Sequence, residues 1–469
     1  MADVRLLADA MHRNTGSLDE RTIDDLELAT LFAAIDRTRT ITGAQVLWRW
    51  LVTPTHDVDV LATREAAIAA VGDIGERLGT STAGEAPDLP RLLWGAPVQP
   101  VSGRVIAASL CALVTCLVLA HWWPVAILGV LLLFAGNIVL DDWSKLRLAH
   151  ASRAVERLDD VLGRAAALAR HLPALATPIA GDLALRSRIS RRVAMLRVRD
   201  PFDALELLRA GLLVRLTLTR SCLRIVDAER DRLRRIVLWF GEIDALASIG
   251  TLRSERTTHV PELVPGPPML VARDLVHPGI PNAVGNDVEL AASGLLITGS
   301  NMSGKSTLLR TIAVNAILAQ SFHTTFGAWR ASPLHVRAVM RIADDPERGM
   351  STYAVEVAAM RELVADDRPC LFAIDEPFNG TNPAVRVPIV VAVLEYLVGR
   401  GLVVAATHDL DVATRLNQQF ARAYFEERDG TFDRRLRAGI APATNAVEIL
   451  LRAHYPAEIT NRLVAAPAP

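Results

Sequence analysis

The chain has 469 residues, which is more than one ordinary hydrophobic core holds, so we expect two to four structural units. A formal net charge of -1 excludes a globally basic protein of the histone kind and leaves only a local basic face for any contact with nucleic acid. The four cysteines form no CxxC pair and have no histidine at metal spacing, which excludes a disulfide framework and a zinc site as the basis of the fold.

Residues 1–98 read as helices joined by loops. The segment 17–20 (Ser-Leu-Asp-Glu) fits a capping box, and apolar residues follow it at helical spacing up to Ile35. Pro54 interrupts the pattern, and residues 79–90 are rich in Gly, Ser, Thr and Pro, as a surface loop is. We therefore assign 1–98 to the first part of a helical domain.

Hydrophobic residues make up 51% of the chain, and they are concentrated between Val105 and Leu140, where no Asp, Glu, Lys or Arg occurs. Only 121–124 (His-Trp-Trp-Pro) interrupts this stretch, so it predicts two apolar helices and a turn. Each arm of about 16 residues is ~24 Å long, slightly less than the ~30 Å hydrocarbon thickness of a bilayer. We interpret 99–150 as a transmembrane helical hairpin, with basic residues at both ends that could snorkel.

The basic residues that flank the hairpin, Arg104, Lys145 and Arg147, place both of its ends in the cytoplasm by the positive-inside rule. The expected location is the inner (cytoplasmic) membrane, with the C-terminal domain facing the cytoplasm. The alternative is a hairpin buried inside a soluble helical domain, because such arms also have a normal length for core helices.

Residues 151–260 are rich in Arg and Leu and are predicted to form an antiparallel helical domain. A cluster of prolines between 261 and 268 marks the boundary to a last domain, 261–469. Two arginine-rich stretches, 186–199 and 230–235, are candidates for phosphate contacts with DNA. They are equally compatible with solvated helix faces, since arginine replaces lysine almost everywhere in this chain.

The chemistry begins after a short apolar strand at 294–298, which leads directly into GxxxxGK[ST] and a helix. In such a loop the glycines let backbone N–H groups face phosphates, Lys305 reaches the β and γ oxygens, and Ser306 can ligate Mg²⁺. The sequence therefore predicts a site for ATP and Mg²⁺. Its residues are Gly299, Ser300, Asn301, Met302, Ser303, Gly304, Lys305, Ser306 and Thr307.

Two further apolar strands end in polar residues. Residues 370–374 precede Asp375 and Glu376, where one carboxylate can hold Mg²⁺ and the next can act on the attacking water. Residues 402–406 precede Thr407 and His408, which places a histidine where it could sense a γ-phosphate. Strands that alternate with helices imply an α/β P-loop NTPase fold with a mostly parallel sheet and the ligand at the strands' C-terminal ends.

These stretches resemble the MutS family of ABC-type ATPases. Residues 299–309 (GSNMSGKSTLL) are similar to its phosphate loop, 349–356 (GMSTYAVE) to its Ser-Thr-aromatic signature, and 375–382 with 406–408 to its Walker B, D-loop and histidine switch. Residues 31–54 and 242–249 resemble the start and the end of the family's helical core. The LSGGQ signature of transporter ATPases is absent.

The resemblance implies an ATP hydrolase that works as a homodimer with composite sites, in which Ser351 of one protomer completes the other's site. Glu376, His408 and Ser351 are then the catalytic residues, and Ser306 and Asp375 hold the metal. The hairpin inside the core region resembles the membrane-associated subgroup of the family, and we expect no mismatch-recognition domain, because there is no room for one before residue 20.

The resulting prediction is a membrane-anchored MutS-like ATPase, with coupling to DNA binding or repair left open. Two alternatives remain. One is a soluble DNA-remodelling ATPase whose hairpin is part of the core, and the other is a membrane scaffold gated by nucleotide, in which turnover is incidental.

Overall fold

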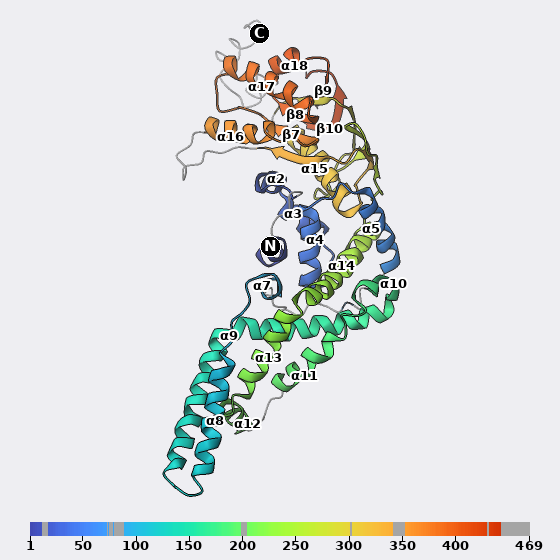
Figure 1. Ribbon diagram of the computed structural model, residues 1–469. Coiled ribbons are helices and arrows are strands. Elements are labelled where there is room, and N and C mark those ends of the chain that lie inside the picture. Colours follow the sequence, from blue (N-terminus) through green and yellow to red (C-terminus); the bar gives the residue numbers. More distant parts are fainter. Residues whose placement is uncertain are drawn as a thin grey trace. The chain divides into compact units, whose positions relative to one another are not determined.

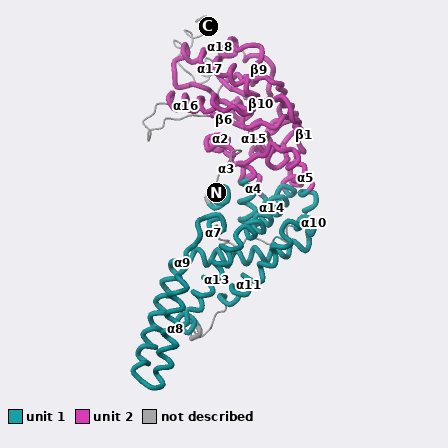
Figure 2. The backbone as a smooth tube through the Cα atoms, viewed as in Figure 1, with its two compact units in different colours: residues 1–13, 37–49, 67–251 teal, residues 14–36, 50–66, 252–469 magenta. Residues whose placement is uncertain are grey.

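The computed structural model describes residues 1–11, 17–72, 74, 78, 89–197, 204–300, 303–340, 352–428 and 431–441. The chain forms two compact units, which are coloured separately in Figure 2. Unit 1 comprises residues 1–13, 37–49 and 67–251, and unit 2 comprises residues 14–36, 50–66 and 252–469. Each unit is therefore assembled from three separate stretches of sequence.

The described part of unit 1 is built from helices. Its elements are α1 (Ala2–Ala10), α4 (Ile41–Val52), α7 (Leu89–Trp94), α8 (Gly103–Leu119), α9 (Ala126–His171), α10 (Pro173–Ala176), η1 (Thr177–Ile179), α11 (Leu185–Arg197), α12 (Ala204–Gly211), α13 (Val214–Ala228) and α14 (Arg230–Glu255). Helices α4 and α14 run a few residues past the unit boundary. Helix α5 (Val58–Val71) is divided between the two units.

A buried carboxylate on α14 holds the beginning of α4. Asp244 accepts hydrogen bonds from the backbone N–H of Arg39 (3.0 Å) and from the N–H and hydroxyl of Thr40 (2.8 and 2.6 Å). Its Oδ2 lies where a side chain on Gly43 would begin, since a Cβ there would be 2.1 Å away. Thr40 thus supplies hydrogen bonds that the buried carboxylate of Asp244 needs, and Gly43 leaves the space that this carboxylate occupies at the first turn of α4.

The apolar stretch forms two helices and a turn, as predicted. Helix α8 packs beside the first half of α9, and the turn of the pair extends away from the other helices of unit 1 (Figure 1). Helix α9 continues without a break for 46 residues, and only 11% of its most apolar window is buried. Apart from the part of α9 that α12 contacts, much of the apolar surface of the hairpin is therefore exposed among the described residues.

The described part of unit 2 contains two sheets. The larger has the strand order β10-β9-β4-β8-β7-β6, in which only the β10–β9 pair is antiparallel, and the smaller has the order β1-β5-β2-β3. The strands are β1 (Glu262–Leu263), β2 (Met269–Leu275), β3 (Asn286–Ala291), β4 (Gly294–Thr298), β5 (Ala328–Ala331), β6 (His335–Val339), β7 (Cys370–Asp375), β8 (Gly401–Thr407), β9 (Phe420–Arg428) and β10 (Thr431–Ala438). The helices are α2 (Glu20–Asp25), α3 (Leu28–Ile35), α15 (Lys305–Phe322), α16 (Thr352–Val364), α17 (Pro383–Val398) and α18 (Leu410–Arg415).

The predicted, mostly parallel arrangement of the central strands is confirmed. Every residue of β4, β7 and β8 is buried, as expected for parallel strands covered on both faces, and this is why they read as unbroken apolar runs. Side chains from these strands form one core cluster with α16, α17 and α18, while α15 packs on β6, β7 and β8.

The N-terminal helices of unit 2 differ from the prediction at their first cap. The cap of α2 is Asp19 rather than Ser17, because its carboxylate accepts the N–H of Thr22 at 2.9 Å. The residues with helical spacing up to Ile35 form two helices, since Glu27 has a left-handed φ of 52° and separates α2 from α3. The spacing did not indicate where this break lies.

Helix α2 covers β6, which is an edge strand of the large sheet. The hydroxyl of Thr22 accepts the N–H of Ala338 (3.1 Å), and the carboxylate of Asp25 accepts the N–H of Met340 (2.9 Å). Asp19 forms an ion pair with Arg337 at 3.1 Å. Side chains of the N-terminal segment therefore bind backbone groups that β6 would otherwise leave free.

We expect Asp25→Asn to stabilise the protein near neutral pH. Burial raises the pKa of the Asp25 carboxyl from 3.8 to about 6, although the Met340 N–H and nearby arginines act in the opposite direction. The unfolded chain releases this proton first, so stability falls as the pH rises from about 4 to 6 and stays low above that. The amide of asparagine has no charge to desolvate. The gain in free energy of unfolding of the variant over the wild type should therefore grow by about 1 kcal/mol between pH 5 and 8. This is less than the full pKa shift implies, because the side chain is partly exposed.

Thermal unfolding of the Asp25→Asn variant at the two pH values measures this difference. Asp24→Asn, a substitution at the exposed neighbouring residue, is the matched control. An Asp25→Asn effect of equal size at pH 5 and pH 8 would contradict the expected titration.

Candidate functional site

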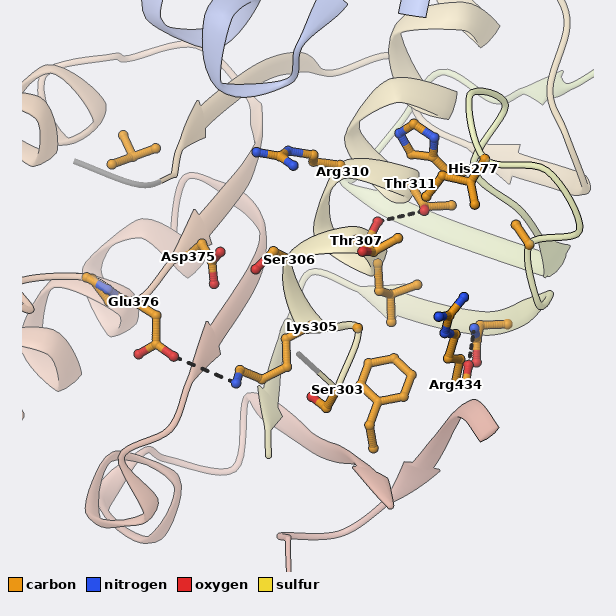
Figure 3. Close-up of a pocket in the computed structure, with 18 of the residues that line it drawn as sticks. His277, Ser303, Lys305, Ser306, Thr307, Arg310, Thr311, Asp375, Glu376 and Arg434 are labelled. Atoms are coloured by element: carbon orange, nitrogen blue, oxygen red, sulfur yellow. Dashed lines mark hydrogen bonds and ion pairs between the residues drawn. The ribbon is translucent and has the colours of Figure 1, made fainter. Parts of the chain in front are cut away.

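Strand order brings the candidate residues together. Strands β4, β8 and β7 are neighbours, with Thr298 paired to Thr407 and Asp375 paired to Ala406 at their C-terminal ends. The loops that follow these strands therefore meet at one edge of the sheet, beside the first turn of α15 (Figure 3).

The loop between β4 and α15 depends on two glycines. Gly299 has φ = 142° and Gly304 has φ = 111°, which are values that side chains rarely tolerate. Gly304 is the N-cap of α15, so this turn directs the start of the helix. Ser303 is buried, and its Oγ has no hydrogen-bond partner among the described residues.

Lys305 is buried, with 5% of its surface exposed. Its Nζ donates to the carbonyl oxygens of Gly299 (2.7 Å) and Ser300 (2.9 Å) and lies 3.8 Å from Oε1 of Glu376. Burial lowers the pKa of Lys305, while Glu376 and Asp375 act to raise it. A cation is thus held inside the loop and faces two carboxylates.

Asp375 lies at the end of β7, beside Ser306 (Figure 3). Burial raises the pKa of Asp375, and a hydrogen bond from the Ser306 hydroxyl opposes that shift. Oδ1 of Asp375 is buried without a hydrogen-bond partner among the described residues. One carboxylate with a free oxygen next to a hydroxyl suits Mg²⁺, which commonly takes few protein ligands and fills its octahedron with waters and phosphate oxygens. No group of three or more candidate metal ligands is found among the described residues.

Glu376 and His408 form a pair across two strands. Nδ1 of His408 lies 2.7 Å from Oε2 of Glu376, and this hydrogen bond raises the pKa of His408 against the effect of burial. Glu376 has a left-handed φ of 49°, and its N–H donates to the carbonyl of Ala406 at 2.9 Å. Such backbone strain in a non-glycine residue is common at functional sites. The other oxygen of Glu376 remains directed toward Lys305 (Figure 3).

Two groups that the sequence analysis did not assign hold the loop after β7. Glu356 of α16 is buried and accepts the N–H groups of Asn379 (3.0 Å) and Gly380 (3.1 Å). Arg386 of α17 binds the carboxylate of Asp409 at 2.7 Å and Oδ1 of Asn379 at 3.1 Å. Glu356 stood at the end of the signature-like stretch, but no pattern indicated which backbone groups it would bind.

The strand ends border a pocket of about 790 Å³, within the usual size range of ligand sites. Its polar end is formed by the residues described above. Its other part is lined by apolar side chains together with the polar residues His277, Asn286, Arg310, Thr311 and Arg434. Burial lowers the pKa of His277 to about 4, so the ring is neutral at neutral pH. These residues lie in no recognisable motif, and the sequence analysis missed them.

The structure places most of the predicted site residues together. Lys305, Ser306, Thr307, Asp375 and Glu376 line the pocket, together with Ser303 and Gly304. Gly299 and Ser300 contact Lys305, and His408 contacts Glu376. Asn301, Met302 and Ser351 lie outside the described residues.

Ion pairs within unit 1 involve all four arginines of 230–235 but only Arg188 and Arg197 of the stretch 186–199, in which Arg199 lies outside the described residues. The pairs are Arg188–Glu229 (2.9 Å), Arg197–Asp160 (2.9 Å), Arg230–Asp227 (2.5 Å), Arg232–Asp182 (2.6 Å), Arg234–Asp231 (2.9 Å) and Arg235–Asp182 (2.8 Å). Carboxylates therefore neutralise much of the charge of 230–235 that DNA phosphates would need, which favours the interpretation of this stretch as a solvated helix face.

Comparisons with known proteins bear on the family of the chain. A helical N-terminal part followed by a mixed-sheet C-terminal domain is consistent with a MutS-like fold, and residues 295–466 match the family model of MutS domain V. The comparisons thus support the resemblance to the MutS family that the motifs indicated.

Similar curated proteins carry the same family name. The DNA mismatch repair protein MutS of Chloroflexus aurantiacus is 31% identical over 284 residues, which cover 52% of this chain and 29% of that protein. The protein of that name from Natronomonas pharaonis is 29% identical over 291 residues, covering 58% of this chain and 32% of the relative. DNA mismatch repair protein MutS 2 of Haloarcula marismortui is 32% identical over 178 residues, which cover 36% of this chain and 19% of that protein. The chain thus spans about a third or less of the length of these relatives.

Proposed function

We propose that unit 2 binds and hydrolyses ATP in the pocket between α15 and the ends of β4, β7 and β8. The observation that carries the proposal is the grouping of Lys305, Asp375, Glu376 and His408 at one sheet edge beside a glycine-dependent loop and a helix N-terminus. A buried cation and a helix N-terminus favour phosphates, and a carboxylate oxygen beside them can accept a proton from water. Steady-state hydrolysis of ATP by the full chain tests the proposal against the scaffold alternative, for which turnover would be negligible.

The roles follow from the contacts. Lys305 exchanges the carbonyls of Gly299 and Ser300 for phosphate oxygens, and Glu376 acts as the general base. His408 orients the carboxylate of Glu376 through its Nδ1 contact. Ser306 and Asp375 would hold Mg²⁺, which when bound neutralises charge on the phosphate oxygens. The apolar part of the pocket, with neutral His277, would receive the base of the nucleotide.

We further propose a homodimer in which Ser351 of a second copy approaches the γ-phosphate. This part rests on the family resemblance of residues 349–356, and the relation to MutS domain V supports it. DNA binding rests on the relatives, which are named DNA mismatch repair proteins. Because all four arginines of 230–235 are ion-paired, a DNA contact there would have to break those pairs, so the stretch 186–199 is the better candidate of the two.

Membrane anchoring is proposed for the α8–α9 hairpin, with the ATPase domain on the cytoplasmic side of the inner membrane. Trp122 and Trp123 at the turn are 68% and 71% exposed, and Leu128 and Leu132 of α9 are 59% and 65% exposed. A continuous exposed apolar surface of this kind is rare in soluble monomers and is typical of lipid contact. Trp143, whose ring Arg147 approaches at 5.2 Å, and Lys145 suit the polar boundary at the other end.

We expect a membrane-impermeant reagent to label the cysteine of a Trp123→Cys variant when it is added to the outer side of the membrane and not when it is added to the cytoplasmic side. The native Cys111 and Cys116 would first be replaced by alanine, since both lie in the hairpin. A cysteine at exposed Ser187 of α11 is the control and should be labelled only from the cytoplasmic side. Labelling of position 123 from the cytoplasmic side alone would instead support a soluble hairpin.

A further inference from the structure

Helix α12 is attached to the middle of the hairpin rather than to its base. Asn137 of α9 is buried, and its amide donates to the carbonyl of Gly211 at 2.8 Å. The ring of Phe134 lies directly on Gly211, where a Cβ would come within 2.0 Å of it. In Figure 1 the end of α12 lies beside the middle part of α8 and α9, in agreement with these contacts.

The depth of α12 follows from the rise of α9. Asn137 precedes Asp141, the first charged residue after the apolar stretch, by four residues and Lys145 by eight, which at 1.5 Å per residue is about 6 Å and about 12 Å toward the turn of the hairpin. If Trp143 and the ion pair of Asp142 with Lys145 mark the polar boundary of the bilayer, the C-terminal end of α12 lies about one to two helical turns inside the apolar layer. A helix that merely rested on the headgroups would contact α9 near Lys145 instead.

The composition of α12 agrees with that depth. Leu207, Leu208 and Leu212 are 56%, 49% and 40% exposed, while Ala210 and Gly211 face α9 and are buried. Glu206 and Arg209 lie one turn apart, with Oε1 and NH1 3.8 Å from each other. An exposed leucine face thus adjoins the exposed apolar surface of the hairpin, and the two charges on the helix face each other.

The bond from Asn137 also satisfies the end of α12. The last carbonyl groups of a helix have no partner within it, and a buried carbonyl without a partner is costly. Asn137 supplies a donor to the carbonyl of Gly211, which is one of these groups. Since both residues are buried, this bond fixes the end of α12 against α9.

From these contacts we propose that α12 is a third membrane-inserted element, embedded in the cytoplasmic half of the bilayer with Leu207, Leu208 and Leu212 against lipid acyl chains. This inference rests on the proposed membrane anchoring of the hairpin. It adds that the anchor has three helical elements and that the chain enters the lipid layer a second time near residue 204.

Nitroxide accessibility in the full chain tests the proposal. A spin label is placed at Leu208→Cys in the background without Cys111 and Cys116, and the protein is reconstituted into vesicles of phosphatidylcholine and phosphatidylglycerol. We expect collisions with oxygen, which partitions into lipid, to exceed those with a water-soluble nickel chelate several-fold. Labels at Leu132→Cys in the hairpin and Ser187→Cys on α11 are the lipid and water references, and Leu212→Cys, directly after α12, is a second test position.

The outcomes separate the two proposals. If nickel reaches the label at position 132, the membrane anchoring of the hairpin fails. If position 132 is in lipid but nickel reaches positions 208 and 212, the hairpin anchor stands and the insertion of α12 is wrong. Low collision rates with both reagents at 208 and 212 would show that protein, such as a second copy of the chain, covers this face, and would also overturn the inference.

Discussion

The Glu376→Gln variant is expected to bind ATP about as well as the wild-type chain but to hydrolyse it at least ~100-fold more slowly, as follows from the loss of a general base. Glutamine has the same length, and its one carbonyl oxygen can keep the contact with His408 (2.7 Å), while its NH2 group replaces the oxygen that faces Lys305. Its amide cannot take a proton from water. Single-turnover hydrolysis measured beside equilibrium nucleotide binding separates the two effects.

A matched control is Glu362→Gln on the exposed face of α16, which makes the same chemical change away from the pocket and should leave turnover intact. Turnover near the wild-type rate in the Glu376→Gln variant would remove Glu376 from the mechanism. Loss of ATP binding together with turnover would indicate instead that the carboxylate mainly holds Lys305 in place.

Replacing Lys305 is expected to abolish tight ATP binding. The side chain is buried and already bridges the loop carbonyls of Gly299 and Ser300 to the carboxylates, so its ammonium is in position to meet phosphate oxygens. Lys305→Ala removes the charge and the volume, whereas Lys305→Met removes the charge and retains most of the volume. Binding of a fluorescent ATP analogue should be lost in both variants, and thermal unfolding verifies that they remain folded.

Lys305→Arg refines this test. The chain uses arginine for nearly all of its basic residues, yet a branched guanidinium does not fit a position that exposes only 5% of its surface. We therefore expect arginine to rescue binding poorly. Full rescue would show that charge alone, and not the geometry of a single buried ammonium, determines binding.

The Lys305→Ala variant also addresses the proposed dimer. If Ser351 of one copy completes the site of the other, a mixed dimer of Lys305→Ala and Ser351→Ala protomers contains one rebuilt site and one doubly defective site. ATPase activity should then pass through a maximum as the mixing ratio changes. A straight line between the two inactive endpoints would mean that Ser351 acts only within its own chain, for example as a helix cap.

Much of the site could be predicted because its residues sit at the ends of buried strands. Apolar runs that end in Asp375 and Glu376 or lead to His408 indicated parallel strands, and neighbouring parallel strands bring their C-terminal ends together. Glu356 and His277 could not be assigned in the same way. Glu356 acts on backbone N–H groups, which have no signature in sequence, and His277 becomes a pocket residue only through the packing of its loop.

The helical part was predicted less completely. The apolar stretch identified the hairpin, but the continuation of α9 for 46 residues was not anticipated, because amphipathic spacing after Leu140 does not show whether a helix continues or restarts. The position of the break between α2 and α3 at Glu27 was not predicted either. A left-handed residue that is not glycine leaves no mark in composition, and only contacts such as that of Asp25 with Met340 fix it.

The cover that α2 provides on β6 has a consequence for dividing this protein into fragments. Edge strands with free N–H groups invite pairing with strands of other molecules, and Thr22 and Asp25 occupy two of these groups. A fragment that begins at residue 261 retains the pocket residues but loses residues 14–36 and 50–66, which belong to the same compact unit. The smallest piece of this chain that protects its own sheet from aggregation is therefore not a continuous one.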